Sequence, residues 1–394
     1  MGADVLELND TQTAIVETVR DFVTNEVIPV ADDLEHADEY PEKIVEQMKE
    51  LGLFGLTVPE EYDGIGESLI TYALVVVELA RGWMSLSGVL NTHFMGCYLI
   101  NKFGTDDQKK SLLPRLATGE IRAALAMSEP EAGSDVQSIK TRAIADGDDY
   151  VVNGQKMWLT NGLRSGVVMT LVKTDPKTDP PHKGMSMLIV EKEPGNPQPA
   201  PGLDVGKNIE KMGYKGVETT EMTFADYRIP RTALLGTEEG QGFRQVLDGI
   251  EVGRVNVAAR AVGVSTRAFE EAIKYSQERK AFGKPICDHQ AIQIHLAEMG
   301  TTLEAARLML FSAAEKKAAG ERSDLEAGMA KLFASEACHE ICLKALRVHG
   351  GYGYSKEFTV ERLYRDAPFL LIGEGTSEIQ KTVIARRLLE RYKV

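Results

Sequence analysis

The chain opens with hydrophobic residues at helical spacing. One apolar stripe consists of Ile15, Val19, Phe22 and Val27. This spacing predicts a helix that Pro29 ends, because proline lacks the N–H that a helix interior needs. A second helix is expected over residues 41–51, where Gly52 is the stop signal. Longer apolar stretches at 68–80, 86–103 and 109–116 predict helices that are buried on several sides.

The hydrophobic period changes in the middle of the chain. Short runs rich in β-branched residues follow one another, separated by Gly, Pro and Asp, at 151–154, 167–172, 185–190 and 219–224. Runs of this length and composition are typical of β-strands. The sequence therefore predicts a compact β domain inserted between helical blocks.

Helical periodicity returns in the last third. One stripe is Leu303, Ala306, Leu310 and Ala314, and another is Leu325, Met329, Phe333, Ala337 and Ile341. Long helices with such stripes suit a bundle, and part of their surface is expected to be a subunit interface. The predicted organisation is an N-terminal helical domain (1–122), a central β domain (123–235) and a C-terminal helical bundle (236–394).

Composition narrows the class of protein. The 394 residues are 43% hydrophobic and 26% charged, with a formal net charge of -14, which argues against a nucleic-acid surface because phosphate binding needs clustered Lys and Arg. We expect no secretory signal, no membrane span and no metal site. Cys97, Cys287, Cys338 and Cys342 are too scattered for a disulfide framework, and reduced, packed thiols in a cytoplasmic protein are the favoured interpretation.

Glu374 stands between two glycines at the end of an apolar run, residues 368–372. A carboxyl group in an apolar pocket has a raised pKa, which makes it a competent base near neutral pH. The flanking glycines let the backbone approach a flat ligand closely. The alternative is an ordinary turn with a solvated carboxylate, which is the more common case for an isolated Gly-Glu-Gly.

Two further motifs lie at the start and in the first half of the β block. Residues 126–135 contain the pair Gly133 and Ser134, whose N–H and hydroxyl donors suit a polar ring or a phosphate, although a plain turn explains them too. In residues 156–162, Trp158 and Thr160 face the same way if the segment is a strand. Tryptophan is rarely left on a surface strand, so core packing is the alternative here.

Two motifs in the last third carry glycines beside charged or aromatic residues. Arg279 stands near Phe282 and a glycine turn, and a guanidinium so placed is suited to bidentate binding of a pyrophosphate. Residues 347–354 contain Gly350 and Gly351, which permit close backbone approach. A solvated helix end and a flexible loop are the alternative interpretations.

In this order and at these separations, the five motifs resemble the acyl-CoA dehydrogenase family, and the resemblance runs from about residue 10 to Arg391. It implies an α+β fold in which the central domain is β-barrel-like and the C-terminal domain is a four-helix-type bundle. It also implies a flavin enzyme, usually a homotetramer, with FAD between these two domains. The implied reaction is the α,β-dehydrogenation of an acyl-CoA thioester to the trans-2-enoyl-CoA, with electrons passed to an electron-transfer flavoprotein.

The resemblance assigns roles to residues by matching motifs. Glu374 matches the catalytic glutamate, and the substrate is expected to meet Ser134, Arg254 and Gly375. Residues expected at the flavin end are Met127, Ser128, Trp158 and Thr160, with Thr376 and Glu378 near FAD beside the base. Residues expected to reach the FAD of a neighbouring subunit are Arg279, Phe282, Gln290, Arg347, Gly350 and Gly351.

In the implied mechanism Glu374 removes the α-proton while the β-hydrogen leaves as hydride to the flavin. The backbone N–H of Glu374 and an FAD ribityl hydroxyl would hold the thioester oxygen. Gly373 stands where many relatives have a bulky aromatic residue, which predicts a wider pocket, and Arg347 stands where Gln is common.

Glu251 offers a second acid on the segment from which some relatives supply the base. Those relatives place the acid immediately before the arginine, where this chain has Gly253. The expected role of Glu251 is therefore a charge pair with Arg254 or with a neighbour on a helix surface.

Two other functions stay open at the level of sequence. A flavin oxidase would use the same scaffold and pass electrons to oxygen. A flavin-bearing nucleic-acid-binding stress protein would need a basic C-terminal face, which the net acidity disfavours.

Overall fold

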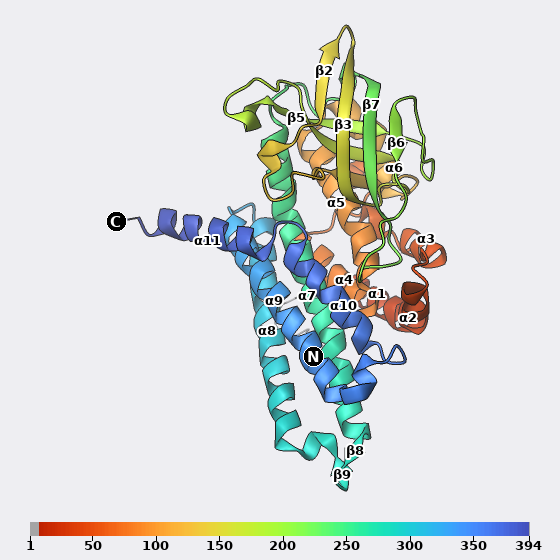
Figure 1. Cartoon of the computed structure of the whole chain (residues 1–394), viewed down its shortest axis with the longest axis vertical. Helices are drawn as coiled ribbons and strands as arrows, with labels where there is room; N and C mark the ends of the chain where they lie inside the picture. The colour runs from red at the N-terminus through yellow and green to blue at the C-terminus, as the bar shows by residue number, and fades with distance from the viewer. Residues whose placement is uncertain (1–7, 394) are drawn as a thin grey trace.

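The computed structural model describes residues 8–393, and its N-terminal block is helical (Figure 1). Its helices are α1 (Asp10–Phe22), α2 (Ile28–His36), α3 (Glu42–Glu50), α4 (Leu69–Gly82), α5 (Met84–Phe103) and α6 (Asp106–Ala117). A π-helical turn, Val23–Val27, joins α1 to α2. The prediction that Pro29 ends the first helix is therefore wrong. Pro29 lies in the first turn of α2, where the missing N–H has little cost.

The middle block is a curled sheet. Its strands are β1 (Ala123–Ala126), β2 (Arg142–Asp146), β3 (Asp149–Thr160), β4 (Val167–Lys173), β5 (Met185–Glu191), β6 (Leu203–Val205) and β7 (Thr219–Pro230). The order is β1-β4-β2-β3-β7-β6, with β5 paired to β4. The predicted strands at 167–172 and 185–190 are confirmed, whereas 151–154 and 219–224 are only parts of the long strands β3 and β7. The strands β1, β2 and β6 were not predicted.

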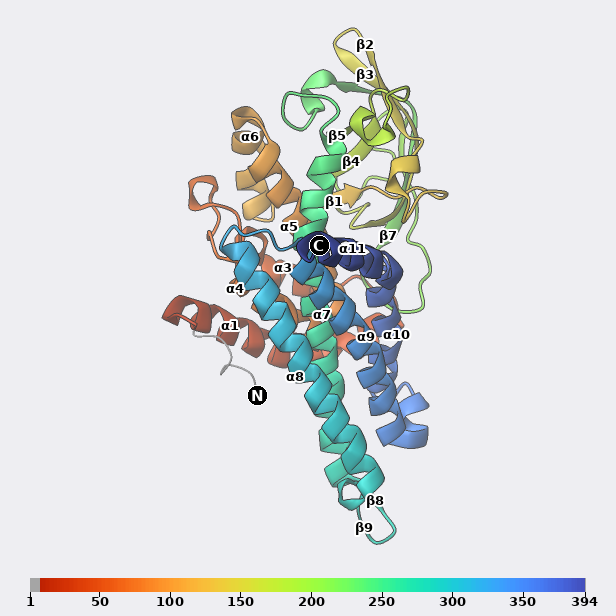
Figure 2. The same ribbon diagram turned by 90° about the vertical axis from the view of Figure 1, so that its left-hand side faces the viewer.

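The C-terminal block is built around one long helix. It contains α7 (Gly242–Glu278), the hairpin β8 (Lys280–Ala281) and β9 (Lys284–Pro285), α8 (Gln290–Ala318), α9 (Asp324–His349), α10 (Val360–Ile372) and α11 (Ser377–Arg391). The helix α7 packs on α8, α9 and α10 and also on α4 and α5 of the first block. Figure 2 shows α7 running through the molecule from the sheet to the β8–β9 hairpin at the opposite end.

The two predicted apolar stripes of this block differ in burial. Leu303, Ala306, Leu310 and Ala314 are all buried, as predicted. In the second stripe Phe333 is exposed, and further large apolar side chains are exposed at Ile294, Leu308, Ile372, Leu389 and Tyr392. The helix α11 projects from the bundle (Figure 1). The C-terminal block thus presents apolar surface that one chain leaves uncovered.

Two other expectations concern cysteines and membranes. The four cysteines are free, and Cys97, Cys338 and Cys342 are buried while Cys287 is partly exposed. Within residues 8–393, no helix has the length and apolar character needed to cross a bilayer.

Candidate active site

Glu374 lies in the link between α10 and α11, where the chain takes left-handed backbone angles. Its φ is 55° and that of Gly375 is 91°, and only the second position is occupied by a residue that favours such angles. The side chain turns inward, so that Oε2 is buried and has no hydrogen-bond partner among residues 8–393. Asn91 of α5 donates its Nδ2 to Oε1. The carboxylate is therefore both strained and buried with one oxygen unpaired, a combination that is common at functional sites.

Burial raises the pKa of Glu374 above the usual value, and three cations oppose this shift. In order of effect the opposing groups are Arg260, the Asn91 hydrogen bond, Lys331 and Arg254. Lys331 of α9 is fully buried and donates to the carbonyl of Gly375 at 2.8 Å. Burial also lowers the pKa of Lys331 to about 8. The carboxylate is thus poised as a base whose ionised form is supported by surrounding positive charge.

Gly253 of α7 packs directly against the carboxylate of Glu374, and its lack of a side chain leaves room for that group. A Cβ atom added at Gly253 would stand 2.1 Å from Oε2 of Glu374, which no real contact allows. A side chain at position 253 and a carboxylate at 374 therefore exclude each other in this arrangement. Glu251 lies away from this contact, since it pairs with Lys317 at 3.1 Å and accepts from Ser323 at 2.8 Å. The expected partner Arg254 is not its direct ion pair.

The backbone beside the base offers a free donor. Among the described residues, the N–H of Glu374 has no hydrogen-bond acceptor. Arg254 is partly buried, and the Glu374 charge is among those that raise its pKa, although burial lowers that pKa more. A base, a neighbouring N–H and an arginine thus meet at the junction of α7, α9 and the α10–α11 link.

A second group of predicted residues surrounds the end of β1. Lys156 is fully buried and donates to the Met127 carbonyl at 3.1 Å and to Glu129 at 2.8 Å. The pKa of Lys156 falls to about 8 because burial outweighs the attraction of Glu129. The N–H of Met157 donates to the carbonyl of Ser128 at 2.9 Å. These bonds hold the Met127–Ser128 backbone beside the strand that carries Trp158.

Trp158 is not a core residue. Its side chain is 56% exposed and its φ is 67°. The β3–β7 register shifts between Lys156 and Leu159, so Trp158 and Thr160 do not follow the simple alternation of a regular strand. The core-packing alternative is therefore wrong. Ser134 is exposed on the loop that follows β1.

A third group lies near the β8–β9 hairpin, far along α7. Arg279, Phe282, Gly350 and Gly351 line a cavity of about 840 Å³. A Cβ at either glycine would meet no atom within 4 Å, and the Arg279 guanidinium stands 5.7 Å from the Tyr352 ring centroid. An open cradle with a cation suits a dinucleotide. Gln290 starts α8 next to it, whereas Arg347 is exposed in the last turn of α9 and does not line the cavity.

The structure does not bring all the predicted residues together in one chain. About 36 Å of helix separate Arg254 from the end of α7 at Glu278, at a rise of about 1.5 Å per residue. The Arg279 cradle is therefore remote from the Glu374 pocket of the same chain. Thr376 caps α11 by accepting from the N–H of Ile379 at 3.3 Å, and Glu378 is exposed in its first turn.

The pocket is not wider at Gly373. A Cβ there would come within 2.9 Å of the Phe369 ring, so Phe369 fills the space that was expected to be open. Phe369 stacks on Tyr214, with ring centroids 4.4 Å apart and an interplanar angle of 15°. The prediction of a wider pocket is therefore wrong, because an aromatic ring from α10 occupies that space.

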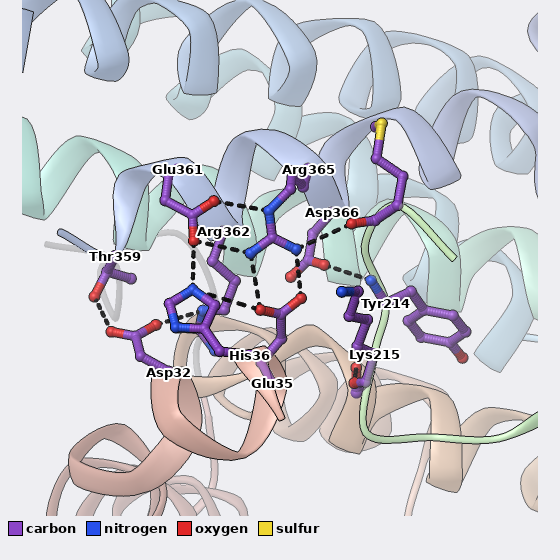
Figure 3. Close-up of polar contacts among 12 residues, drawn as sticks. Asp32, Glu35, His36, Tyr214, Lys215, Thr359, Glu361, Arg362, Arg365 and Asp366 are labelled. Atoms are coloured by element: carbon purple, nitrogen blue, oxygen red, sulfur yellow. Dashed lines mark hydrogen bonds and ion pairs between the residues drawn. The ribbon is translucent and has the colours of Figure 1, made fainter. Parts of the chain in front are cut away.

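A network of ion pairs fixes α10 and the Tyr214 loop (Figure 3). Arg365 contacts both carboxylate oxygens of Glu35, at 2.6 and 2.8 Å, and pairs with Glu361 at 2.7 Å. Asp366 accepts from the N–H of Tyr214 at 2.6 Å. Burial raises the pKa of Asp366 to about 6. Glu35, His36 and Glu361 lie close enough together to hold a metal ion, but the Arg365 guanidinium already satisfies the two carboxylates.

Sequence reasoning missed Asn91, Tyr214, Arg260 and Lys331 near Glu374, and Lys156 beside Met127. A signal was present for one of them. Asn91 is a polar residue inside the long apolar stretch 86–103. Lys331 had no such signal, because it lies on the opposite helix face from the predicted stripe 325–341. A polar group that an apolar helix must bury needs a partner, and the partner of Asn91 is Glu374.

The site thus combines a buried, strained carboxylate between helical blocks with a separate open cavity beside Arg279. Comparison with known proteins shows the family. Residues 9–120, 124–227 and 240–389 match the N-terminal, middle and C-terminal domains of acyl-CoA dehydrogenase. The chain belongs to the acyl-CoA dehydrogenase family, whose members are FAD flavoproteins acting on CH–CH donors.

Three relatives show how far the similarity extends. An acyl-CoA dehydrogenase of Bacillus subtilis (strain 168) is 39% identical over 98% of this chain and 99% of its own length. The mitochondrial short-chain specific acyl-CoA dehydrogenase of Bos taurus is 39% identical over 98% of this chain and 92% of its own. The structure of butyryl-CoA dehydrogenase from Megasphaera elsdenii superposes with a TM-score of 0.93 at 33% identity, over 98% and 99% of the two chains.

Proposed function

We propose that this protein removes the α-proton and the β-hydrogen of a short acyl-CoA thioester to give the trans-2-enoyl-CoA, with Glu374 as the base. The observation that supports this most strongly is the position of the Glu374 carboxylate. It is buried, its Oε2 has no partner, and its raised pKa has burial as its main cause. No structural role of such a group explains its cost.

Asn91 and the atoms of Glu374 have separate roles in the proposed reaction. Asn91 holds Oε1, so Oε2 is the oxygen free to take the α-proton. The N–H of Glu374, which lacks an acceptor, stabilises the negative charge that develops on the thioester oxygen. Bound FAD supplies the hydride acceptor. The α-proton thus goes to Glu374, and FAD, when bound, would take up the β-hydrogen with its electron pair, so that the oxidation balances.

Two separate groups of residues are suited to bind FAD. The group near the β domain consists of Met127, Ser128, Trp158 and Thr160. The other group lines the cavity beside Arg279. Because α7 keeps these groups apart in one chain, each FAD is expected to contact two subunits. The exposed apolar side chains of α8, α9 and α11 support an oligomer, for which the family resemblance suggests a homotetramer.

Arg279→Ala is expected to release FAD more readily than the parent, because a guanidinium–pyrophosphate contact is lost. The measurement is the flavin retained after dialysis, read from the absorbance of the protein fraction. Lys280→Ala is the matched control, since Lys280 is a cation of the same hairpin that does not line the cavity. Equal retention in the Arg279 and Lys280 variants would remove Arg279 from the FAD site.

A site shared between subunits predicts that FAD binding depends on protein concentration. If two subunits build each site, FAD should dissociate as the protein is diluted through its subunit dissociation. Sedimentation of the holoenzyme at decreasing concentration, with simultaneous flavin and protein absorbance, measures both events. A monomer that keeps its flavin at every concentration would contradict the shared site.

Lys331→Met is expected to move the pH dependence of flavin reduction. The buried Lys331 cation lowers the pKa of Glu374, so its removal raises that pKa. Because the base acts in its ionised form, the rising limb of rate against pH should shift to higher pH. Lys344→Met on the same helix, which breaks only the exposed pair with Glu298, should leave the limb unchanged. A parental pH profile in Lys331→Met would show that Lys331 does not act on the base.

Reduction and reoxidation of the flavin test both the substrate and the electron acceptor. The purified protein should be yellow, and anaerobic butyryl-CoA should bleach its flavin. We propose an electron-transfer flavoprotein as the acceptor, so reoxidation should be fast with that partner and slow in air. Fast reoxidation in air would favour the oxidase instead. A cytoplasmic location stays a prediction from the sequence.

A further inference from the structure

Arg260 is a buried cation to which the proposed reaction gives only one role, its effect on the pKa of Glu374. It lies on α7 two turns beyond Gly253 and is only 1% exposed. Its terminal nitrogens make two long hydrogen bonds, to the Tyr214 hydroxyl at 3.4 Å and to the Ser87 carbonyl at 3.5 Å. Its Nε has no partner among residues 8–393. A buried guanidinium held so weakly is costly unless something further binds it.

The surroundings hold Arg260 in place without neutralising it. Its guanidinium stands over the stacked Tyr214 and Phe369 rings, at 5.6 and 5.9 Å from their centroids. Aromatic faces attract a cation but carry no net charge. No carboxylate of the described residues forms an ion pair with Arg260, and the charge with the largest opposing effect on the Glu374 carboxyl is that of Arg260. The positive charge of Arg260 thus acts on the carboxylate of Glu374.

The positive charge of Arg260 loses its counter-charge when Glu374 is protonated during the reaction. When Glu374 takes the α-proton it becomes neutral, and a buried cation without a counter-charge is strongly unfavourable. An uncharged acyl chain would not relieve this cost, whereas a chain that ends in a carboxylate would.

We propose that Arg260 binds the terminal carboxylate of the acyl group, so that the preferred substrate is the CoA thioester of a short dicarboxylic acid. This inference rests on the proposed function. The length follows from α7: Arg260 lies seven residues beyond Gly253, which packs against Oε2 of Glu374, and seven residues of helix span about 10 Å. That distance suits an acyl chain of four or five carbons.

The test compares pairs of thioesters that differ only at the far end. Succinyl-CoA is matched with butyryl-CoA, and glutaryl-CoA with valeryl-CoA, in anaerobic reduction of the FAD holoenzyme. The measured quantity is the ratio of kcat/KM for the carboxylate-terminated and methyl-terminated members of each pair. Within one variant, this ratio cancels any effect of Arg260 on the pKa of Glu374.

The parent is expected to favour the carboxylate-terminated member of at least one pair. In Arg260→Gln the ratio should fall by roughly 10²- to 10³-fold, as expected when one partner of a buried charge pair is removed, and Arg260→Lys should restore part of it. Arg267→Gln is the matched control. Arg267 lies on the same helix and pairs with Glu271 at 2.8 Å, so its loss should leave the ratio unchanged.

Three results would overturn the inference. The parent would favour the methyl-terminated thioesters, or Arg260→Gln would slow both members of a pair equally, in which case Arg260 serves only the base. In both cases the flavin is still bleached and the proposed function stands. If none of the four thioesters bleaches the flavin of the parent, the proposed function fails together with the inference. The parent comparison decides the question even if Arg260→Gln does not fold.

Discussion

Glu374→Gln should retain FAD and bind acyl-CoA yet reduce its flavin roughly 10²- to 10⁴-fold more slowly, which is the usual contribution of a positioned general base. The substitution keeps the shape of the side chain, and its carbonyl oxygen still accepts from Asn91. Only the basic oxygen is lost. The measurement is the rate of flavin bleaching after anaerobic mixing with butyryl-CoA, with CoA-ester binding titrated separately.

The control for this variant is Glu251→Gln. Glu251 lies on the same segment of α7 as Gly253 but pairs with Lys317 and Ser323, so most of the parental rate should remain. Bleaching at the parental rate in Glu374→Gln would refute the role of Glu374. Loss of bleaching in Glu251→Gln alone would transfer the role of base to Glu251.

Gly253→Ala should slow flavin reduction by about 10²-fold although no reactive group is removed. The new Cβ would stand 2.1 Å from Oε2 of Glu374 and 3.2 Å from Sδ of Met95, so the carboxylate must move. A displacement of about 1 Å of a catalytic group costs a rate factor of this size. The measurement is the same anaerobic bleaching, with flavin content and thermal unfolding recorded for each protein.

The matched control for Gly253→Ala is Gly300→Ala on α8. There the added Cβ would meet only the Phe269 ring, at 3.4 Å, which is an ordinary contact. Both substitutions replace glycine in a helix and gain the same helix propensity. A parental rate in Gly253→Ala would mean that the carboxylate can leave its position without consequence, which would contradict the geometry of the base.

The order of helical and β blocks is readable in the sequence because the hydrophobic period changes twice. Irregular backbone is not readable in the same way. The π-helical turn at Val23–Val27 carries the chain past Pro29, and the bulge near Trp158 turns a large aromatic side chain outward. Both features break the regular spacing on which such predictions depend.

The candidate base is also readable in the sequence, because glycines flank an acid at the end of an apolar run. Its partners are not. Asn91, Gly253 and Lys331 lie on α5, α7 and α9, and only the packing of these helices brings them to Glu374. The occupation of the space beside Gly373 by Phe369 depends likewise on tertiary packing. The assigned FAD and substrate contacts stay predictions until a ligand is measured.

The most direct test of the account isolates the proton step. An analogue of butyryl-CoA with sulfur in place of the β-methylene has α-hydrogens but no β-hydrogen, so it cannot deliver hydride. Incubation with the holoenzyme in deuterium oxide, followed by mass spectrometry, measures exchange at the α-carbon. We expect exchange with the parent and with Glu251→Gln and very little with Glu374→Gln. Exchange at the parental rate in Glu374→Gln would show that another group removes the α-proton.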